Sequence, residues 1–266
     1  MASTGEMILK ASAADMRRGR ASREARIVLT IRLAVVGVFF LLWESVSRSG
    51  LIFQDVVPSL FAIGQSIIKL LLSAEFWKNL QVTAFETLTA LTIGAITGVI
   101  AGIVLGANRF IGDAFEPYVY YLSPTPRIIL FPIMIMWFGI GLASKIALGA
   151  LSSFFSIALS TAAGMRQIDK VLIRVGKSFR ATSWQMATKI YLPAMRLPVL
   201  NGIRLGFGTS LITVLLAETK LSNQGLGYMV MSIYNRFDMA GLYALLVIVF
   251  AIAGLGNMLI GRLARE

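Results

Sequence analysis

The sequence predicts an all-α membrane protein with six transmembrane helices. Hydrophobic residues make up 57% of its 266 residues and charged residues only 14%, and the mean hydropathy is +0.77. A soluble domain is about 45–50% apolar and roughly 25% charged. The apolar residues also gather in six runs long enough to cross a bilayer. Most lysines and arginines lie between alternate runs, which is the pattern of a multi-pass membrane protein.

The first run follows a basic segment. Residues 1–26 carry six lysines and arginines, and no short apolar stretch with a small-residue cleavage site follows them. We therefore expect 1–26 to be a cytoplasmic arm and 27–266 to be the transmembrane domain. Residues 27–46 are long enough to form an uncleaved first span. The segment 58–77 has apolar residues at helical spacing with polar residues between them, and it predicts an amphipathic helix at the interface.

The remaining spans follow from the same length requirement of about 20 apolar residues. We predict them over 80–107, 117–138, 144–164, 198–218 and 240–261. With six spans, the predicted inner segments hold 16 of the 25 lysines and arginines, so both termini are expected in the cytoplasm. An odd number of spans would place the two most basic segments on opposite sides of the membrane.

Two of the predicted spans carry unusual residues. Four glycines at four-residue spacing lie on one stripe of the second span: Gly94, Gly98, Gly102 and Gly106. This stripe predicts close packing against a neighbouring helix, with the lining of a pathway as the alternative. The third span contains four prolines: Pro117, Pro124, Pro126 and Pro132. Proline removes a backbone donor, so we expect either a structural kink or a break at a transport site.

The residue inventory limits the chemistry of the chain. Cysteine and histidine are both absent, and disulfides, thiol nucleophiles, imidazole bases and nearly all zinc, haem and iron–sulfur sites depend on them. We therefore expect no catalytic site and no metal site. The net charge of +12 would suggest nucleic acid for a soluble protein. In a membrane protein it reflects topology, so we expect contact with membrane lipid and no nucleic-acid partner.

The inner loop 165–197 is the only long, strongly charged stretch after the arm. Apolar and basic residues alternate over 171–180 and predict a short amphipathic helix. A second helix is predicted over 183–191, ending before Pro193. Such a helix pair suits a groove on a partner protein, and the alternative is a helix pair lying on anionic lipid.

This loop resembles the "EAA" coupling loop of binding-protein-dependent ABC importer permeases. The W-Q, L-P-A and P positions of that pattern are held by Trp184, Gln185, Leu192, Pro193, Ala194 and Pro198. The pattern continues at Gly202, Arg204, Leu205, Ala217 and Glu218, and in the GLGY segment 225–228. The segment PIMIMWFGIG (132–141) resembles the signature of the nitrate, sulfonate and taurine subfamily. The resemblance covers roughly 58–262 and implies a type I importer permease (MetI-like) fold.

The resemblance also implies a set of partners and a mechanism. Separate ABC ATPase subunits would hold ATP and Mg, while this chain would bind no cofactor and would not itself be an enzyme. A second permease copy, most simply an identical one, and a periplasmic solute-binding protein would complete a transporter in the bacterial inner membrane. The transporter would move a small, usually anionic solute by alternating access. The alternatives are a secondary transporter, which would need inverted repeats, and an intramembrane lipid enzyme, which would need clustered catalytic side chains.

The residues that the resemblance assigns to ATPase coupling all lie in the loop. They are Asp169, Arg174, Gly176, Phe179, Arg180, Ala181, Trp184, Leu192 and Pro193. The E-A-A triplet is replaced by residues 174–176, and Arg180 replaces a glycine that permits a tight turn. A Cβ makes a left-handed backbone costlier. We expect the loop to keep its helix–turn–helix shape with a changed and more basic partner surface.

Three charged residues within the spans are candidates for the translocation pathway: Glu86, Arg127 and Glu218. A charge in hydrocarbon is costly, so each should face the bundle interior or a wet cavity. Glu86 and Arg127 lie at similar depths, which allows an ion pair between them. Alternatively, Arg127 contacts the solute or extends toward the interface. The resemblance suggests a structural or gating role for Glu218.

Overall fold

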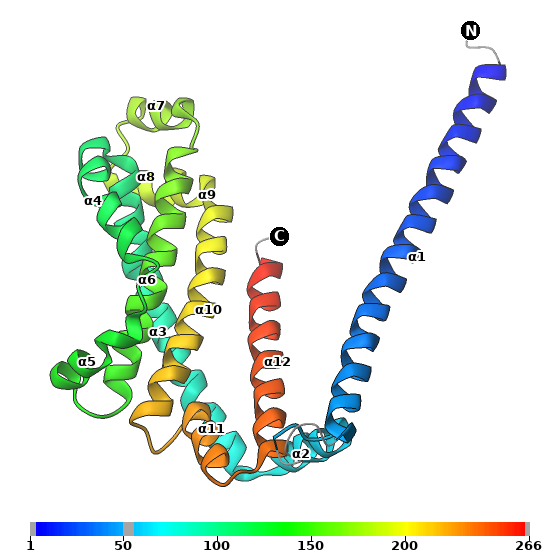
Figure 1. Cartoon of the computed structure of the whole chain (residues 1–266). Coiled ribbons are helices and arrows are strands. Elements are labelled where there is room, and N and C mark those ends of the chain that lie inside the picture. Colours follow the sequence, from blue (N-terminus) through cyan, green and yellow to red (C-terminus); the bar gives the residue numbers. More distant parts are fainter. Residues whose placement is uncertain (1–3, 50–55, 264–266) are drawn as a thin grey trace. The chain divides into compact units, whose positions relative to one another are not determined.

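The chain is helical throughout the part that the computed structural model describes (Figure 1), which comprises residues 4–49 and 56–263. Residues 1–3 of the predicted arm and residues 264–266 of the predicted transmembrane domain lie outside the described residues. Five helices in the described part are long and apolar enough to cross a membrane. A bent helix pair brings the number to six when it is counted as one span. The predicted all-α class is therefore confirmed.

The chain divides into two compact units, residues 1–63 and 64–266. The first unit contains the long helix α1 (Thr4–Ser49), and its segment Arg26–Ser49 is apolar enough to span a membrane, as predicted for 27–46. The predicted boundary between arm and span at residue 26 falls inside α1. The cytoplasmic placement of the arm stays a prediction.

The amphipathic helix predicted over 58–77 ends earlier than expected. Helix α2 covers Leu60–Leu72, and Ser73 interrupts the helical run because its backbone is extended (φ −79°, ψ 126°). The next helix, α3 (Ala74–Ala107), begins directly after Ser73 and therefore starts six residues before the predicted span. Serine is favoured in this position before a helix, and Glu75 in the first turn suits the positive end of the helix dipole.

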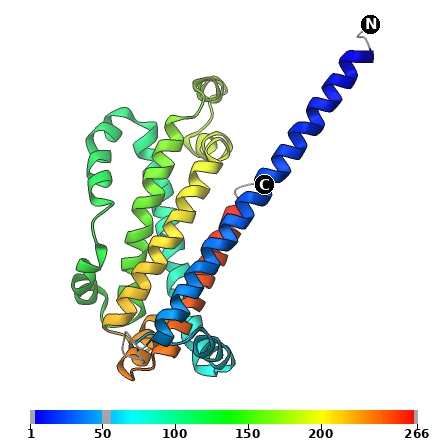
Figure 2. The same ribbon diagram turned by 45° about the vertical axis from the view of Figure 1, so that its right-hand side comes forward.

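Three helices form the core of the second unit. Helix α6 (Leu142–Arg166) packs against both α3 and α10 (Arg196–Lys220), and Figures 1 and 2 show α10 running beside α6 along most of its length. Helix α12 (Met239–Leu263) runs beside α10. The predicted spans 144–164, 198–218 and 240–261 are thus confirmed to within a few residues at each end.

The glycine stripe on α3 explains how closely α3 and α6 approach. A Cβ built on Gly98 would lie 2.9 Å from the carbonyl oxygen of Phe154, and one on Gly102 would lie 2.6 Å from that of Ala158. Both contacts are with the backbone of α6, which cannot move aside. The stripe therefore serves close helix packing, as the first of the two interpretations predicted.

The third span differs from its prediction. Instead of one kinked helix over 117–138, the chain forms α4 (Arg109–Leu122), the 3-10 turn η1 (Arg127–Leu130) and α5 (Phe131–Phe138), with a bend of 93°. The helix breaks around Pro126, whose backbone is extended (φ −64°, ψ 97°). Helix α4 also begins earlier than the predicted span.

The two ends of the second unit carry the shorter helices. At the end that we call the α7 end lie α7 (Lys170–Ser178), α8 (Ser183–Met186), the π-helix η2 (Ala187–Tyr191) and α9 (Leu192–Ala194) (Figure 1). The opposite end, the α11 end, carries α11 (Leu226–Asn235), which was not predicted.

The predicted stop before Pro193 is wrong, because the helical run continues through α9. Proline has no N–H and crowds the preceding turn. The π-turn before it widens the helix: the amide of Leu192 donates to the carbonyl of Ala187, five residues back. The chain therefore reaches α10 with a break only at Met195 (φ −108°, ψ 22°).

Candidate functional site

The coupling segment, residues 169–193, forms two short helices that pack on each other. Asp169 caps α7 by accepting a hydrogen bond from the amide of Val171 at 2.8 Å. Gly176 is buried on the inner side of α7, where a Cβ would collide with the side chains of Ile190 and Met186. An alanine at this position, as in the family pattern, would require these two flexible side chains to shift.

The turn after α7 places Arg180 in the left-handed region, with φ 51°. The amide of Ala181 donates to the carbonyl of Gly176 at 3.1 Å, and that of Arg180 donates to Lys177 at 2.9 Å. This pair of bonds defines a Schellman motif, in which glycine is the usual residue at the left-handed position. The loop thus keeps its turn although arginine replaces glycine, as expected.

We predict that Arg180→Gly raises the free energy of unfolding of the purified protein by about 1 kcal/mol, because it removes the cost of a Cβ in the left-handed region. SDS titration followed by circular dichroism measures the change. Arg174→Gly, in the middle of α7, is the matched control and is expected to lower stability by about 1 kcal/mol. A less stable Arg180→Gly variant would contradict the backbone geometry of this turn.

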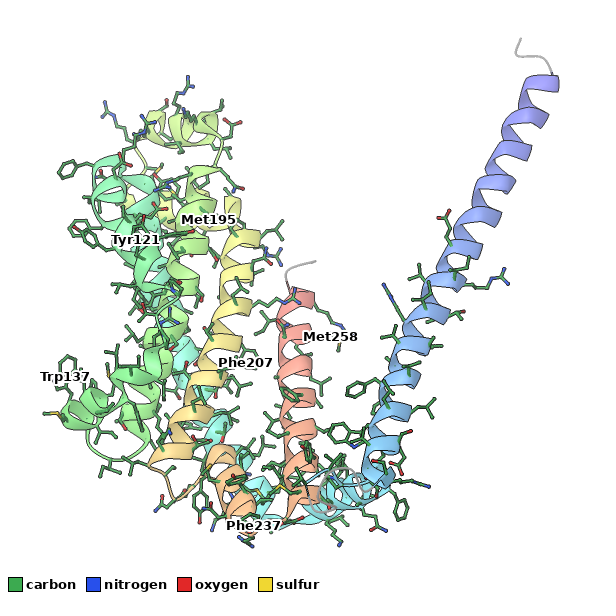
Figure 3. The ribbon with its side chains drawn as sticks, in the orientation of Figure 1. Tyr121, Trp137, Met195, Phe207, Phe237 and Met258 are labelled. Atoms are coloured by element: carbon green, nitrogen blue, oxygen red, sulfur yellow. The ribbon has the colours of Figure 1, made fainter. Side chains whose placement is uncertain are left out.

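The second half of the coupling segment is also held firmly. Thr182 and Gln185 form a capping box at the start of α8: the amide of Gln185 donates to Thr182 Oγ1 at 3.3 Å, and the amide of Thr182 donates to Gln185 Oε1 at 2.9 Å. Beneath the segment, Met195 is fully buried and packs with Met165 and Ile168 (Figure 3).

Two large aromatic side chains of the segment face outward. Phe179 is 81% exposed and Trp184 is 76% exposed. Arg174, Arg180, Leu192 and Pro193 are exposed as well, whereas Ala181 is half-buried. Exposed aromatic residues on a fixed, basic scaffold are the usual anchors of a protein interface. We call this set of exposed side chains the coupling surface.

A cluster of three buried ionisable side chains lies at the α11 end. Glu86 of α3 and Lys145 of α6 form an ion pair, with 2.5 Å between Glu86 Oε1 and Lys145 Nζ. Glu218 of α10 is also buried, at 1% exposure. The predicted ion pair between Glu86 and Arg127 is wrong, since helix depth does not fix the direction in which a side chain points.

Glu218 fastens α11 to the bundle. One carboxylate oxygen accepts a hydrogen bond from the hydroxyl of Thr83 at 2.7 Å, and the other accepts from the amide of Gly227 at 2.7 Å. The amide of Leu226 in turn donates to Thr83 Oγ1 at 2.8 Å. Gly225 precedes the helix with φ 103°, and a Cβ there would overlap the Glu218 carboxylate. The GLGY segment therefore holds this acid through the amide of Gly227 and holds its partner Thr83 through the amide of Leu226.

Arg127 lies apart from this cluster, at the break between α4 and η1. Its guanidinium donates to the carbonyl of Ser123 and stacks over the ring of Phe155, 4.9 Å from the centroid. Of the three predicted pathway residues, the structure brings Glu86 and Glu218 together and leaves Arg127 elsewhere. Their role in translocation stays a prediction.

The sequence interpretation missed Lys145, which was counted as a loop residue. The available signal was a lysine in the first turn of an apolar helix, where a charge needs a partner. Among the residues that the structure describes, no group of three acidic side chains could hold a metal ion.

A cavity of about 750 Å³ opens beside the charge cluster at the α11 end. It lies between the first turns of α3 and α6 and the segment that joins α10 to α11. Its walls are formed by Lys78, Gln81, Val82, Phe85, Ile140, Gly141, Leu142, Lys145, Lys220, Leu221, Ser222, Asn223 and Gln224.

Residues 94–265 match the family described as "Binding-protein-dependent transport system inner membrane component". The chain belongs to this family. It is 29% identical over 222 residues to the putative aliphatic sulfonates transport permease protein SsuC of Bacillus subtilis, covering 84% of this chain and 80% of the relative. It is 27% identical over 231 residues to the taurine transport system permease protein TauC of Escherichia coli, covering 84% of both chains.

Solved structures of this permease class share the fold. A chain of the MetNI methionine ABC transporter in inward-facing conformations matches with a TM-score of 0.65 and 20% identity, covering 75% of this chain and 96% of that one. A chain of an amino acid ABC transporter matches with a TM-score of 0.51 and 16% identity, covering 77% and 94%. The chain is thus a multi-pass inner-membrane permease subunit of the MetI-like fold, not a secondary transporter or a lipid enzyme.

Proposed function

We propose that this permease moves a small sulfonate-bearing anion into the cell and that separate subunits hydrolyse the ATP that drives transport. The names of the relatives SsuC and TauC support a sulfonate as the solute. ATP and Mg belong to the partner subunits in this proposal, and the permease itself binds no cofactor and catalyses no reaction.

The coupling surface is the proposed docking site for the ATPase, and its two exposed aromatic residues carry this proposal. Phe179 and Trp184 are 81% and 76% exposed on a segment that also carries exposed basic residues. Such residues supply much of the energy of an interface once a partner covers them. The capping box and the Schellman turn fix the backbone at these positions, so docking has little backbone to order.

The basic α7 end is proposed to face the cytoplasm, together with both termini, in keeping with the positive-inside rule. The α11 end then faces the periplasm and receives the solute-binding protein. A second copy of the chain completes the pathway in this proposal. Exposed apolar residues on α5 support contact with lipid or with that copy, as for Trp137, which is 72% exposed and points away from the bundle (Figure 3).

Helix α10 connects the two ends of the proposed transport path. It begins at Arg196, directly after the coupling segment, and its last turn carries Glu218. Its 25 residues span about 37 Å. A rotation imposed on the coupling segment by the ATPase therefore reaches the acid that fastens α11. This connection supports alternating access, in which closure of the ATPase subunits opens one end and closes the other.

Co-purification tests the proposal. Phe179→Asp and Trp184→Asp are each expected to lower ATPase subunit recovery, and solute-stimulated ATP hydrolysis, at least tenfold, because each removes a buried aromatic anchor from the interface. Membrane insertion should not change. Ser183→Asp adds the same charge next to Trp184 at the start of α8. This control variant should recover the ATPase subunit and hydrolyse ATP like the wild type. Normal association in the two aromatic variants would overturn the docking assignment.

A further inference from the structure

The cavity at the α11 end has the size and the chemistry of a small-molecule site. Its volume of about 750 Å³ falls within the range of roughly 300–1,000 Å³ that is typical of ligand pockets. Polar donors line part of its wall, and Val82, Phe85 and Leu221 line another part. A ligand with one charged group and a short apolar body would satisfy both parts.

The charged side chains that line the cavity are all lysines, and the two that are not ion-paired within the described residues, Lys78 and Lys220, carry its positive charge because Lys145 is paired with Glu86. Three lysines line it, and none of the lining residues is acidic. Lys78 and Lys220 are exposed at its walls, and neither forms an ion pair with another residue in the described part of the chain. Lys145 is 3% exposed and donates a hydrogen bond to Ser222 Oγ at 3.0 Å. The field inside the cavity therefore favours an anion.

The backbone adds to this preference. Gly141 and Leu142 line the cavity where α6, a helix of 25 residues, begins. No side chain caps the first amides of α6 at Gly141. Free amides and the positive end of the helix dipole attract anionic groups. The start of α6 therefore adds to the positive charge that Lys78 and Lys220 supply in the same cavity.

We propose that this cavity binds a small organic oxyanion, with its anionic group between Lys78 and Lys220 and its apolar part against Phe85. A small anion of this kind contacts Val82 and Phe85 inside the cavity as well as the two lysines, whereas the acidic face of a folded protein would use the lysines alone. The identification of this anion with the transported solute rests on the proposed function. The cavity is then the place where the permease receives the solute before the pathway opens.

Isothermal titration calorimetry tests the site on the permease–ATPase complex in phosphatidylcholine nanodiscs, without binding protein or ATP. The probes are ethanesulfonate and dimethyl sulfone, a smaller neutral molecule that keeps the tetrahedral sulfur with two of its oxygens. We expect ethanesulfonate to bind and dimethyl sulfone not to bind. The double variant Lys78→Gln/Lys220→Gln should weaken ethanesulfonate binding about tenfold, since both removed charges face the anion. The control Lys69→Gln/Arg236→Gln removes two charges that do not line the cavity and should bind like the wild type.

Each other outcome overturns the assignment. Equal binding by the Lys78→Gln/Lys220→Gln variant, or equal binding of both probes, would exclude an anion site in the cavity. Loss of ethanesulfonate binding when phosphatidylglycerol is added to the nanodiscs would assign the cavity to a lipid headgroup. If the Lys78→Gln/Lys220→Gln variant binds ethanesulfonate normally and only its association with the solute-binding protein is weaker, the two lysines are a protein-docking site.

Sulfonate uptake separates this inference from the proposed function. If the permease takes up sulfonate and the Lys78→Gln/Lys220→Gln variant still binds ethanesulfonate like the wild type, the anion site in the cavity is refuted and the proposed function stands. Ethanesulfonate binding without uptake of any sulfonate would refute the proposed solute and leave the anion site standing.

Discussion

Lys145→Met is expected to lower the free energy of unfolding of the permease by about 3–5 kcal/mol. The ammonium of Lys145 lies 2.5 Å from Glu86 Oε1, and the two side chains are only 4% and 0% exposed. Its removal leaves the buried Glu86 carboxylate without an ion-pair partner among the described residues. An uncompensated buried charge is among the costliest defects that a single substitution creates. SDS titration of the purified protein, followed by circular dichroism, measures the loss.

Two further variants identify the cause. Lys220→Met removes an exposed lysine from the same end of the bundle and should change stability by no more than about 0.5 kcal/mol. The double variant Glu86→Gln/Lys145→Met should recover most of the loss, because it leaves no unpaired charge. Wild-type stability in Lys145→Met alone would show that the ion pair does not stabilise the fold.

The second large effect is expected at the glycine stripe. Gly102→Ala should lower the free energy of unfolding by about 1–3 kcal/mol, because the new Cβ would lie 2.6 Å from the carbonyl oxygen of Ala158 on α6. The helices would have to separate, and the contacts on both sides of the residue would weaken. The same SDS titration measures this change.

Gly208→Ala on α10 is the matched control with the opposite expected sign. Nothing lies within 4 Å of a Cβ built there. Alanine is a better helix former than glycine, so this variant should gain about 0.5–1 kcal/mol. Equal effects of Gly102→Ala and Gly208→Ala would mean that helix propensity, and not packing, determines the outcome at both sites.

Hydropathy located the long helices well because a transmembrane helix must satisfy its backbone internally and present apolar side chains over a fixed length. The bounds of α6, α10 and α12 follow almost entirely from this length requirement. The coupling segment could also be predicted, since its alternating pattern specifies α7 and the family motif marks Trp184 and Pro193. Its continuation through Pro193 could not, because the π-turn that admits the proline leaves no mark in the sequence.

The charged cluster needed the three-dimensional structure. Depth along a helix follows from residue numbers, but the direction of a side chain depends on how α3, α6 and α10 are rotated against one another. Glu86 therefore received the wrong predicted partner. Helix α11 was missed because its 10 residues are too short to span and its start is held by Asn79 and Thr83 of α3, which are distant from it in the sequence.

The spacing of the glycines on α3 also restricts how the transporter can move. At 1.5 Å per residue, neighbouring glycines of the stripe lie about 6 Å apart along the axis. A slide of α3 along α6 by about half that distance would bring a side chain of α3 against the backbone that a glycine now faces. The stripe thus limits shear between these two helices to small displacements and favours their movement as one rigid pair.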